Sequence, residues 1–116
     1  MTKHILALSV ALFAVSVARA DAVADAKAFI GSQVELIKKG DTDGLKKTFT
    51  ARLQDRITAD NVKKAGAEVS KYTLDDLVAS VEEKEGALKI KMKNGRTLTT
   101  LVKDGGGWKA DTVWFK

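Results

Sequence analysis

The hydrophobic residues of this 116-residue chain follow two different periods in its two halves. Between residues 21 and 71 they recur every three or four positions, which is the spacing of one helical face. From residue 74 to residue 115, apolar and polar side chains alternate and turn residues intervene, as in a sheet that buries one face. The chain has no proline. Helices followed by strands predict one α+β domain over residues 21–116, with three N-terminal helices packed on a roughly four-stranded antiparallel meander.

The first helix is expected over residues 21–39. It should end at Gly40, because glycine readily adopts the left-handed conformation found at helix ends. The apolar stripe of this helix is formed by Val23, Ala26, Ile30, Val34 and Ile37.

Two shorter helices are expected next. The second begins near Asp43 and should break near Thr50, because an unbroken helix would place Arg52 and Arg56 in its apolar arc without partners. The third is expected after Thr58, since threonine is a favoured N-cap residue. The inner face of the third helix is formed by Val62, Ala65 and Val69.

Strands are expected over residues 77–84, 87–93, 96–103 and 108–115. Asn94-Gly95 predicts a two-residue type I′ turn between the second and third strands. That turn would pair Met92 with Thr97, Ile90 with Thr99 and Leu88 with Leu101, and the next loop would pair Lys103 with Trp108. The face toward the helices would then hold Leu88, Ile90, Met92, Thr97, Thr99, Leu101, Trp108, Ala110, Thr112 and Trp114. An extra, bulged residue near residues 99–100 would move part of the third strand to the other face.

The first twenty residues have the three-part layout of a secretory signal peptide. A basic start with Lys3 precedes a 13-residue apolar run over residues 5–17, and Ala18 and Ala20 then form a cleavage pattern. The run is shorter than the ~20 residues that span a bilayer, and the chain has no cysteine to carry a lipid. We expect a protein that is cleaved after Ala20, is periplasmic or secreted, and has no stable membrane anchor.

Composition excludes several kinds of chemistry. The only histidine, His4, lies in the predicted signal peptide, and cysteine is absent. The expected mature chain therefore lacks the side chains of Ser-His-Asp and Cys-His catalysis and of thiolate or imidazole metal sites. No catalytic residue is assigned, and no metal or cofactor is expected. The formal charge of +5 becomes +3 once Lys3 and Arg19 are removed, and this mild excess does not indicate nucleic-acid binding.

The order of a long helix, a Gly-Asp turn, two shorter helices and a closing meander is typical of a known superfamily. The residues that carry the likeness are 37–41 (IKKGD), 45–49, 52–53 and 104–111 (DGGGWKAD). The chain resembles small bacterial members of the nuclear transport factor two-like, or SnoaL-like, superfamily, and among them the lumazine-binding-like domains of unknown function. The resemblance implies a cystatin-like cone, in which a curved sheet wraps around the first helix, often with a pocket at its mouth. It also implies relatives that are isomerases or dehydratases and others that are binding or accessory domains.

Five residues are candidates for binding a ligand in the mouth of such a cone: Gln33, Tyr72, Thr97, Thr99 and Trp108. Gln33 falls within the apolar stripe of the first helix and would offer a hydrogen bond to a ligand, although a structural partner would satisfy its amide equally well. The threonines also suit strands for reasons of propensity alone. Tyr72 and Trp108 are equally consistent with a role in the core.

A basic cluster at the predicted hairpin tip is formed by Lys89, Lys91, Lys93 and Arg96. On the outer face of the sheet it would bind an anionic partner, such as an acidic protein or a lipid headgroup. Alternatively, it is a solvated face that opposes edge-to-edge strand pairing. Leu98 and Val102 among these charges would allow a weak homodimer through the sheet.

Three functions remain open. The first is an exported, non-enzymatic domain that binds a small molecule or a protein partner in the cone mouth. The second is an envelope protein-interaction or immunity-type module that uses the basic outer face. The third and least favoured is an isomerase- or dehydratase-like enzyme, which requires a buried acid or lysine beside the pocket.

Overall fold

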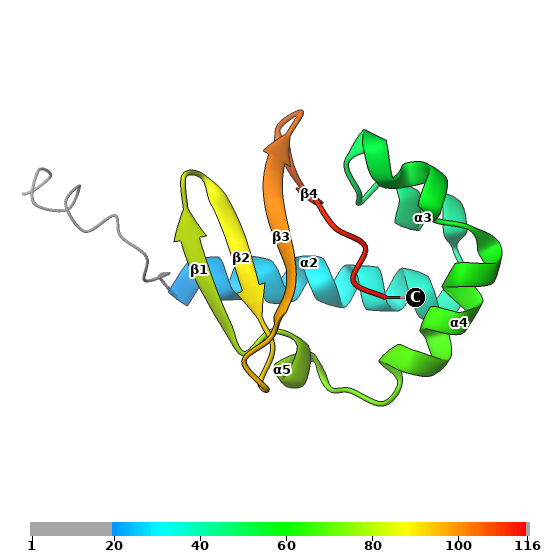
Figure 1. The fold of residues 1–116 in the computed structure, drawn as a ribbon, viewed down its shortest axis with the longest axis horizontal. Helices are drawn as coiled ribbons and strands as arrows, with labels where there is room; N and C mark the ends of the chain where they lie inside the picture. The colour runs from blue at the N-terminus through cyan, green and yellow to red at the C-terminus, as the bar shows by residue number, and fades with distance from the viewer. Residues whose placement is uncertain (1–19, 116) are drawn as a thin grey trace, which may run out of the picture.

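The computed structural model describes residues 20–115, so the predicted signal peptide, apart from Ala20, lies outside the described residues. The fold is α+β, with helices first and then a four-stranded antiparallel sheet that is not closed into a barrel, as the two hydrophobic periods predict (Figure 1). The elements are α2 (Ala20–Lys39), α3 (Thr42–Lys46), the 3-10 helix η1 (Ala51–Arg56), α4 (Ala59–Val69), α5 (Leu74–Leu77), β1 (Ser80–Lys84), β2 (Ala87–Lys91), β3 (Thr97–Asp104) and β4 (Gly107–Ala110). Sheet order follows chain order.

Helix α2 forms the axis of the fold. It crosses one face of the sheet, and α3, η1 and α4 gather around its C-terminal half (Figure 1). Ala26, Ile30 and Ile37 of the predicted stripe are buried. The helix ends where Gly40 takes a φ of +72°. Val23 and Val34 are half-buried against the core, so the first helix is confirmed in its extent and its end, and in three of the five residues of its predicted face.

The second helical segment breaks where the two arginines require it. Helix α3 ends at Lys46, Thr50 is extended with ψ of 154°, and η1 then begins. Arg52 and Arg56 are both exposed. The break keeps two guanidinium groups in water, as predicted.

Threonine caps begin the next two helices. Thr58 Oγ1 accepts a hydrogen bond from Asn61 N at 3.2 Å, which confirms the predicted start of α4. Thr73 and Asp76 form a capping box for α5, with Asp76 N donating to Thr73 Oγ1 at 3.1 Å and Thr73 N donating to Asp76 Oδ2 at 3.0 Å. The prediction of a strand from residue 77 is wrong, because this box makes residues 74–77 helical and β1 begins only at Ser80.

The β2–β3 hairpin has a longer turn than predicted. A type I′ turn needs positive φ at both central residues, and of the pair only Gly95, at +89°, has one. Asn94 Oδ1 accepts a hydrogen bond from Arg96 N at 2.9 Å, and Met92 N donates to Arg96 O at 2.8 Å across a three-residue loop. The predicted pairing of Met92 with Thr97 is therefore wrong.

A bulge at Leu98 then restores the predicted register. Lys91 lies opposite Thr97 and Ile90 opposite Thr99, so Leu98 is an extra residue on β3. Because of the bulge, Leu98 and Thr99 are both buried while Thr97 is exposed, which reverses the predicted faces of Thr97 and Leu98. The predicted pairs that are confirmed are Ile90–Thr99 and Leu88–Leu101.

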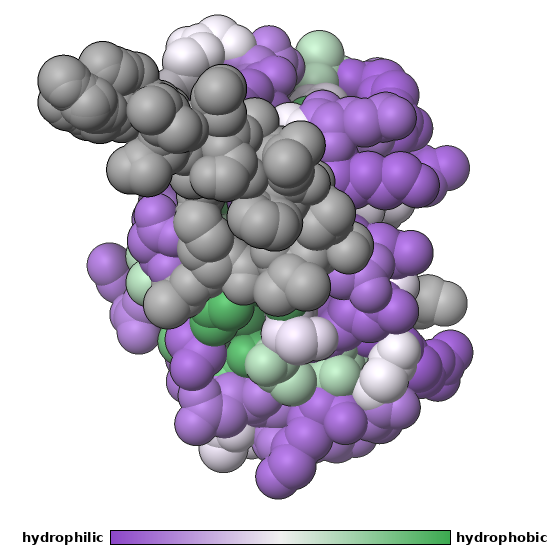
Figure 2. Space-filling view, turned by 90° about the vertical axis from the view of Figure 1, so that its left-hand side faces the viewer, coloured by the Kyte–Doolittle hydropathy of each residue, from purple (hydrophilic) through white to green (hydrophobic). Residues whose placement is uncertain are grey.

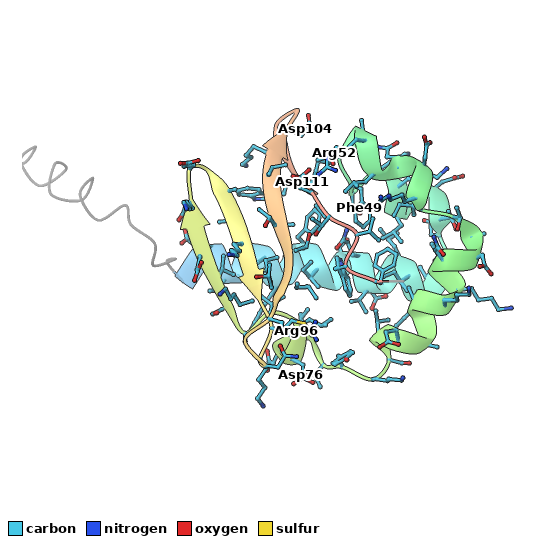
Figure 3. All side chains as sticks on the ribbon, viewed as in Figure 1. Phe49, Arg52, Asp76, Arg96, Asp104 and Asp111 are labelled. Atoms are coloured by element: carbon cyan, nitrogen blue, oxygen red, sulfur yellow. The ribbon has the colours of Figure 1, made fainter. Side chains whose placement is uncertain are left out.

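The last strand is shorter than predicted. Strand β4 ends at Ala110, and Asp111 turns toward η1 (Figure 3). Arg52 Nη2 lies 3.0 Å from Asp111 Oδ1, and Thr50 Oγ1 donates to the same oxygen at 3.2 Å. These contacts draw the chain out of the sheet, so residues 111–115 return across α2 (Figure 1). Thr112, predicted on the inner face, is consequently exposed.

The edge strand β1 is charged on its outer side. Ser80, Glu82 and Lys84 are exposed, whereas Val81 is buried. The described part of this side of the molecule is mostly hydrophilic, with a small hydrophobic area (Figure 2). Charged side chains on an edge strand oppose pairing with a second sheet.

Candidate functional site

A pocket of about 260 Å³ lies at the end of the sheet where the β2–β3 hairpin turns. Four parts of the chain form it: the C-terminal end of α4 with the loop after it, α5, the hairpin and the C-terminal segment. Three of these depart from the predicted structure, because α5, the bulged hairpin and the early end of β4 all contribute walls. Small-molecule sites are commonly concave, apolar within and polar in a few places, and this pocket has both features.

The inner wall of the pocket is apolar. It is formed by Val69, Leu77, Met92, Leu98, Trp114 and Phe115. All but Met92 and Trp114 are buried in the hydrophobic core, so packing fixes the shape of the wall. Covering such a wall stabilises a complex by ~25 cal/mol per Å² of apolar surface removed from water.

The rim of the pocket is polar. It is formed by Glu68, Tyr72, Asn94, Arg96 and Thr97. Tyr72 is 41% exposed, which leaves its ring available to a ligand. Glu68 Oε1 lies 3.8 Å from Lys71 Nζ, so the one acidic group of the rim has a cationic neighbour. The rim thus brings together two predicted ligand residues, Tyr72 and Thr97, and one residue of the predicted basic cluster, Arg96.

Gln33 lies behind the pocket. It is completely buried in α2. Its Oε1 accepts a hydrogen bond from Trp114 Nε1 at 2.8 Å, and its Nε2 donates to Thr48 Oγ1 at 2.8 Å. The Thr48 hydroxyl donates in turn to Leu45 O at 2.6 Å. Both ends of the Gln33 amide have structural partners, and its contribution to the pocket is to orient the Trp114 wall.

The other two predicted ligand residues do not line the pocket. Thr99 is buried beneath the sheet, with its Oγ1 2.7 Å from Thr112 Oγ1. Trp108 is half-buried and pairs with Lys103, as predicted, and Lys103 Nζ lies 4.4 Å from its ring centre. Thr99 ties β3 to the C-terminal segment, whereas Trp108 lies beside the β3–β4 turn.

The structure divides the predicted basic cluster. Lys91 Nζ lies 3.8 Å from Glu82 Oε2, and Lys89 is opposite Glu82 in the β1–β2 register. Lys93 borders a hollow that adjoins the pocket, and Arg96 lines the pocket itself. Half of the cluster therefore lies at the pocket end, and the outer face of the sheet carries compensating acidic charge.

Asp76, in the adjoining hollow, has a clearly lowered pKa. The backbone N–H of Thr73 stabilises its carboxylate most, followed by the Thr73 side chain and the positive charge of Lys93. Together these hold the pKa of Asp76 below its ordinary value of 3.8 despite slight desolvation. Figure 3 shows Asp76 and Arg96 at the same end of the molecule.

Because the pKa of Asp76 is lowered, the stability that its capping box gives the protein should depend on pH. A carboxylate with a depressed folded-state pKa stabilises the fold above its unfolded pKa, and the contribution is lost as pH falls through the folded value. We expect Asp76→Asn to lower Tm at pH 7, and we expect the difference from wild type to shrink as the pH falls below about 4. Asp75→Asn, in the same helix but outside the capping box, is the control, and the exposed ion pair that it removes between Asp75 and Lys27 contributes little. A difference for Asp76→Asn that does not change with pH would contradict the assignment.

Three other kinds of site have structural requirements that can be compared with residues 20–115. No group of three His, Cys, Asp or Glu side chains there is placed to hold a metal ion. None of the acidic or basic side chains in this range is buried, although the enzyme alternative requires one beside the pocket. No helix of the described region is long and apolar enough to cross a bilayer.

No protein-family model, curated protein or solved structure matches this chain. The resemblance to the SnoaL-like superfamily therefore stays a prediction from the sequence. The geometry of the pocket, rather than a relative, is the basis for assigning a function.

The sequence prediction missed most of the apolar wall. Met92 and Trp114 were expected in the core, and Leu98 on the outer face of the sheet. One signal was present: Leu98 and Leu101 are three residues apart, which breaks the alternation of a regular strand and is typical of a bulge. The position of Phe115 depends on the contacts of Asp111 and had no local signal.

Proposed function

We propose that this chain is an exported, non-enzymatic domain that binds a small amphiphilic molecule in the pocket beside the β2–β3 hairpin. The observation that carries the proposal is the combination of a fixed apolar wall with an exposed polar rim. Export rests on the signal-peptide layout of residues 1–20. In this proposal, the pocket takes the place of the cone mouth implied by the SnoaL-like resemblance.

A small molecule suits the pocket better than a protein partner does. The hollow is only about 260 Å³, slightly below the ~300–1,000 Å³ typical of pockets for small molecules, so it suits a compact ligand. Its wall is concave and lies in the core, whereas protein partners usually cover broader surfaces of ~800 Å² per side. The exposed Tyr72 ring stands at the entrance and would cover a ligand that rests on Leu98 and Met92.

The test uses N-phenyl-1-naphthylamine, an uncharged aromatic probe that fluoresces strongly in apolar surroundings. We expect saturable binding to the wild-type domain. Tyr72→Ala should weaken this binding about fivefold, because one aromatic contact contributes ~1 kcal/mol. Leu74→Ala is the matched control, since Leu74 is similarly exposed at 36%, close in sequence and outside the pocket lining.

Two outcomes would refute the proposal. One is the absence of saturable binding of the probe to folded wild-type protein. The other is an equal effect of Tyr72→Ala and Leu74→Ala, which would place the probe outside the pocket. Circular dichroism of each variant checks that it remains folded.

A further inference from the structure

We infer that the molecule bound in this pocket carries one negative charge, which pairs with the guanidinium of Arg96 while its apolar part covers the inner wall. This inference rests on the proposed function and specifies its ligand class: a free, short-chain amphiphilic anion such as a carboxylate or sulfonate.

The position of Arg96 is fixed by its backbone. Its N–H donates to Asn94 Oδ1 at 2.9 Å, and its carbonyl accepts from Met92 N at 2.8 Å. The side chain therefore starts from a defined point on the rim, next to the half-buried Met92 of the inner wall. A charged group and an apolar surface lie side by side, as an amphiphile requires.

The Arg96 side chain makes no ion pair with any residue of the described chain, 20–115. A guanidinium presents five N–H donors and stays charged at any ordinary pH. The side chain is exposed, so water hydrates the guanidinium. An anion on the rim would replace this water with charged acceptors.

The acidic groups nearby already have other contacts. Glu68 lies 3.8 Å from Lys71, and the carboxylate of Asp76 accepts a hydrogen bond from Thr73 N at 3.0 Å. Lys93 and Asp76 carry opposite charges in the adjoining hollow, so Arg96 is the positive charge without an acidic counterpart among these groups. The local balance is therefore positive, and charge-assisted hydrogen bonds beside an apolar wall are stronger than those in open water. A cationic or neutral ligand would form no ion pair with Arg96.

The experiment measures displacement of N-phenyl-1-naphthylamine by octanoate, 1-octanol and octylammonium at pH 7. These competitors share one chain length and differ in head-group charge. We expect octanoate to bind wild type about tenfold more tightly than 1-octanol, and octylammonium to bind most weakly. Arg96→Gln should abolish the preference for octanoate over 1-octanol, and this ratio is compared within each variant so that a general change in pocket affinity cancels.

Lys89→Gln is the control for overall charge, because it removes the same positive charge from an exposed strand position outside the pocket. It should keep the preference for octanoate. Arg96→Lys, which keeps the charge but loses the planar fork, should show an intermediate preference and serves if Arg96→Gln does not fold.

The outcomes separate this inference from the proposed function. Equal affinity for octanoate and 1-octanol, or an equal effect of Arg96→Gln and Lys89→Gln, would overturn the anion assignment and leave the pocket a neutral-ligand site. Failure of all three competitors would also overturn it. Association with phosphatidylglycerol vesicles without octanoate binding would replace the free anion by a membrane surface. If N-phenyl-1-naphthylamine itself does not bind, the proposed function fails as well.

Discussion

Phe49→Ala is expected to lower the free energy of unfolding by about 3–5 kcal/mol, because it removes a large aromatic side chain from the core. Phe49 is completely buried and lies between two helical segments of the chain. Its ring meets that of Phe115 edge to face, with centroids 5.8 Å apart and an interplanar angle of 75°. Removing it opens a cavity where three parts of the fold meet.

The backbone explains why the surroundings of Phe49 are unable to close over that cavity. Phe49 forms an isolated parallel bridge with Ala110, in which Ala110 N donates to Thr48 O at 2.8 Å and Thr50 N donates to Ala110 O at 3.1 Å. This bridge ties the chain before η1 to the end of β4. Because domains of this size are stable by only ~5–15 kcal/mol, the loss would remove a large share of the stability.

Urea denaturation followed by far-ultraviolet circular dichroism measures the effect. Phe29→Ala is the matched control, because Phe29 is the same residue type but only half-buried on α2. Its loss should be clearly smaller. Equal losses for the two variants would contradict the role given to the Phe49 contact.

Gln33→Met is expected to lower the free energy of unfolding by about 1–3 kcal/mol. Methionine preserves the approximate size of the side chain, so the main change is the loss of two hydrogen bonds. The indole N–H of Trp114 loses its 2.8 Å acceptor, and Thr48 Oγ1 loses a donor. Most of the lost stability comes from the unpaired indole N–H of Trp114, because the Thr48 hydroxyl keeps its hydrogen bond to Leu45 O.

A double-mutant cycle with Trp114→Phe isolates the Gln33–Trp114 bond. With Phe at position 114 there is no indole N–H to leave unpaired, so Gln33→Met should cost less in that background than in wild type. Urea denaturation supplies the four free energies. Strictly additive effects would show that the bond contributes nothing to stability.

Most of the helical half was predictable because its signals are local. The stripe of α2, the left-handed Gly40 and the Thr58 cap depend on residues within one or two turns of each other. The capping box of α5 is also local. However, Thr73 and Asp76 stand directly before residues 77–84, whose pattern indicates a strand. A four-residue helix has too few apolar positions to show a period.

The sheet was predictable in order and in part of its register. The expected turn and the actual one differ by one loop residue, and the bulge at Leu98 cancels that difference, so the pairs beyond it are the expected ones. Neither deviation has a strong sequence signal by itself. The sequence prediction therefore placed Thr97 and Leu98 on the wrong faces of the sheet.

The end of β4 was not predictable from local pattern. Residues 108–115 alternate well enough to form one strand, but the tertiary contacts of Asp111 with Arg52 and Thr50 bend the chain after Ala110. That bend places Trp114 and Phe115 in the pocket wall. Aromatic and cationic side chains stand out in a sequence, whereas an apolar wall does not, so Tyr72 was a candidate ligand residue and Arg96 a candidate for an anionic partner on the outer face of the sheet.

The two tryptophans allow the most direct test of ligand binding in this pocket. Trp114 lines the pocket, and Trp108 lies on β4 outside its lining. In a ¹H–¹⁵N correlation spectrum, each indole N–H gives its own signal. On titration with N-phenyl-1-naphthylamine, we expect the Trp114 indole signal to shift to saturation while that of Trp108 stays in place. A shift of Trp108 alone, or of neither indole at saturating probe, would contradict binding in this pocket.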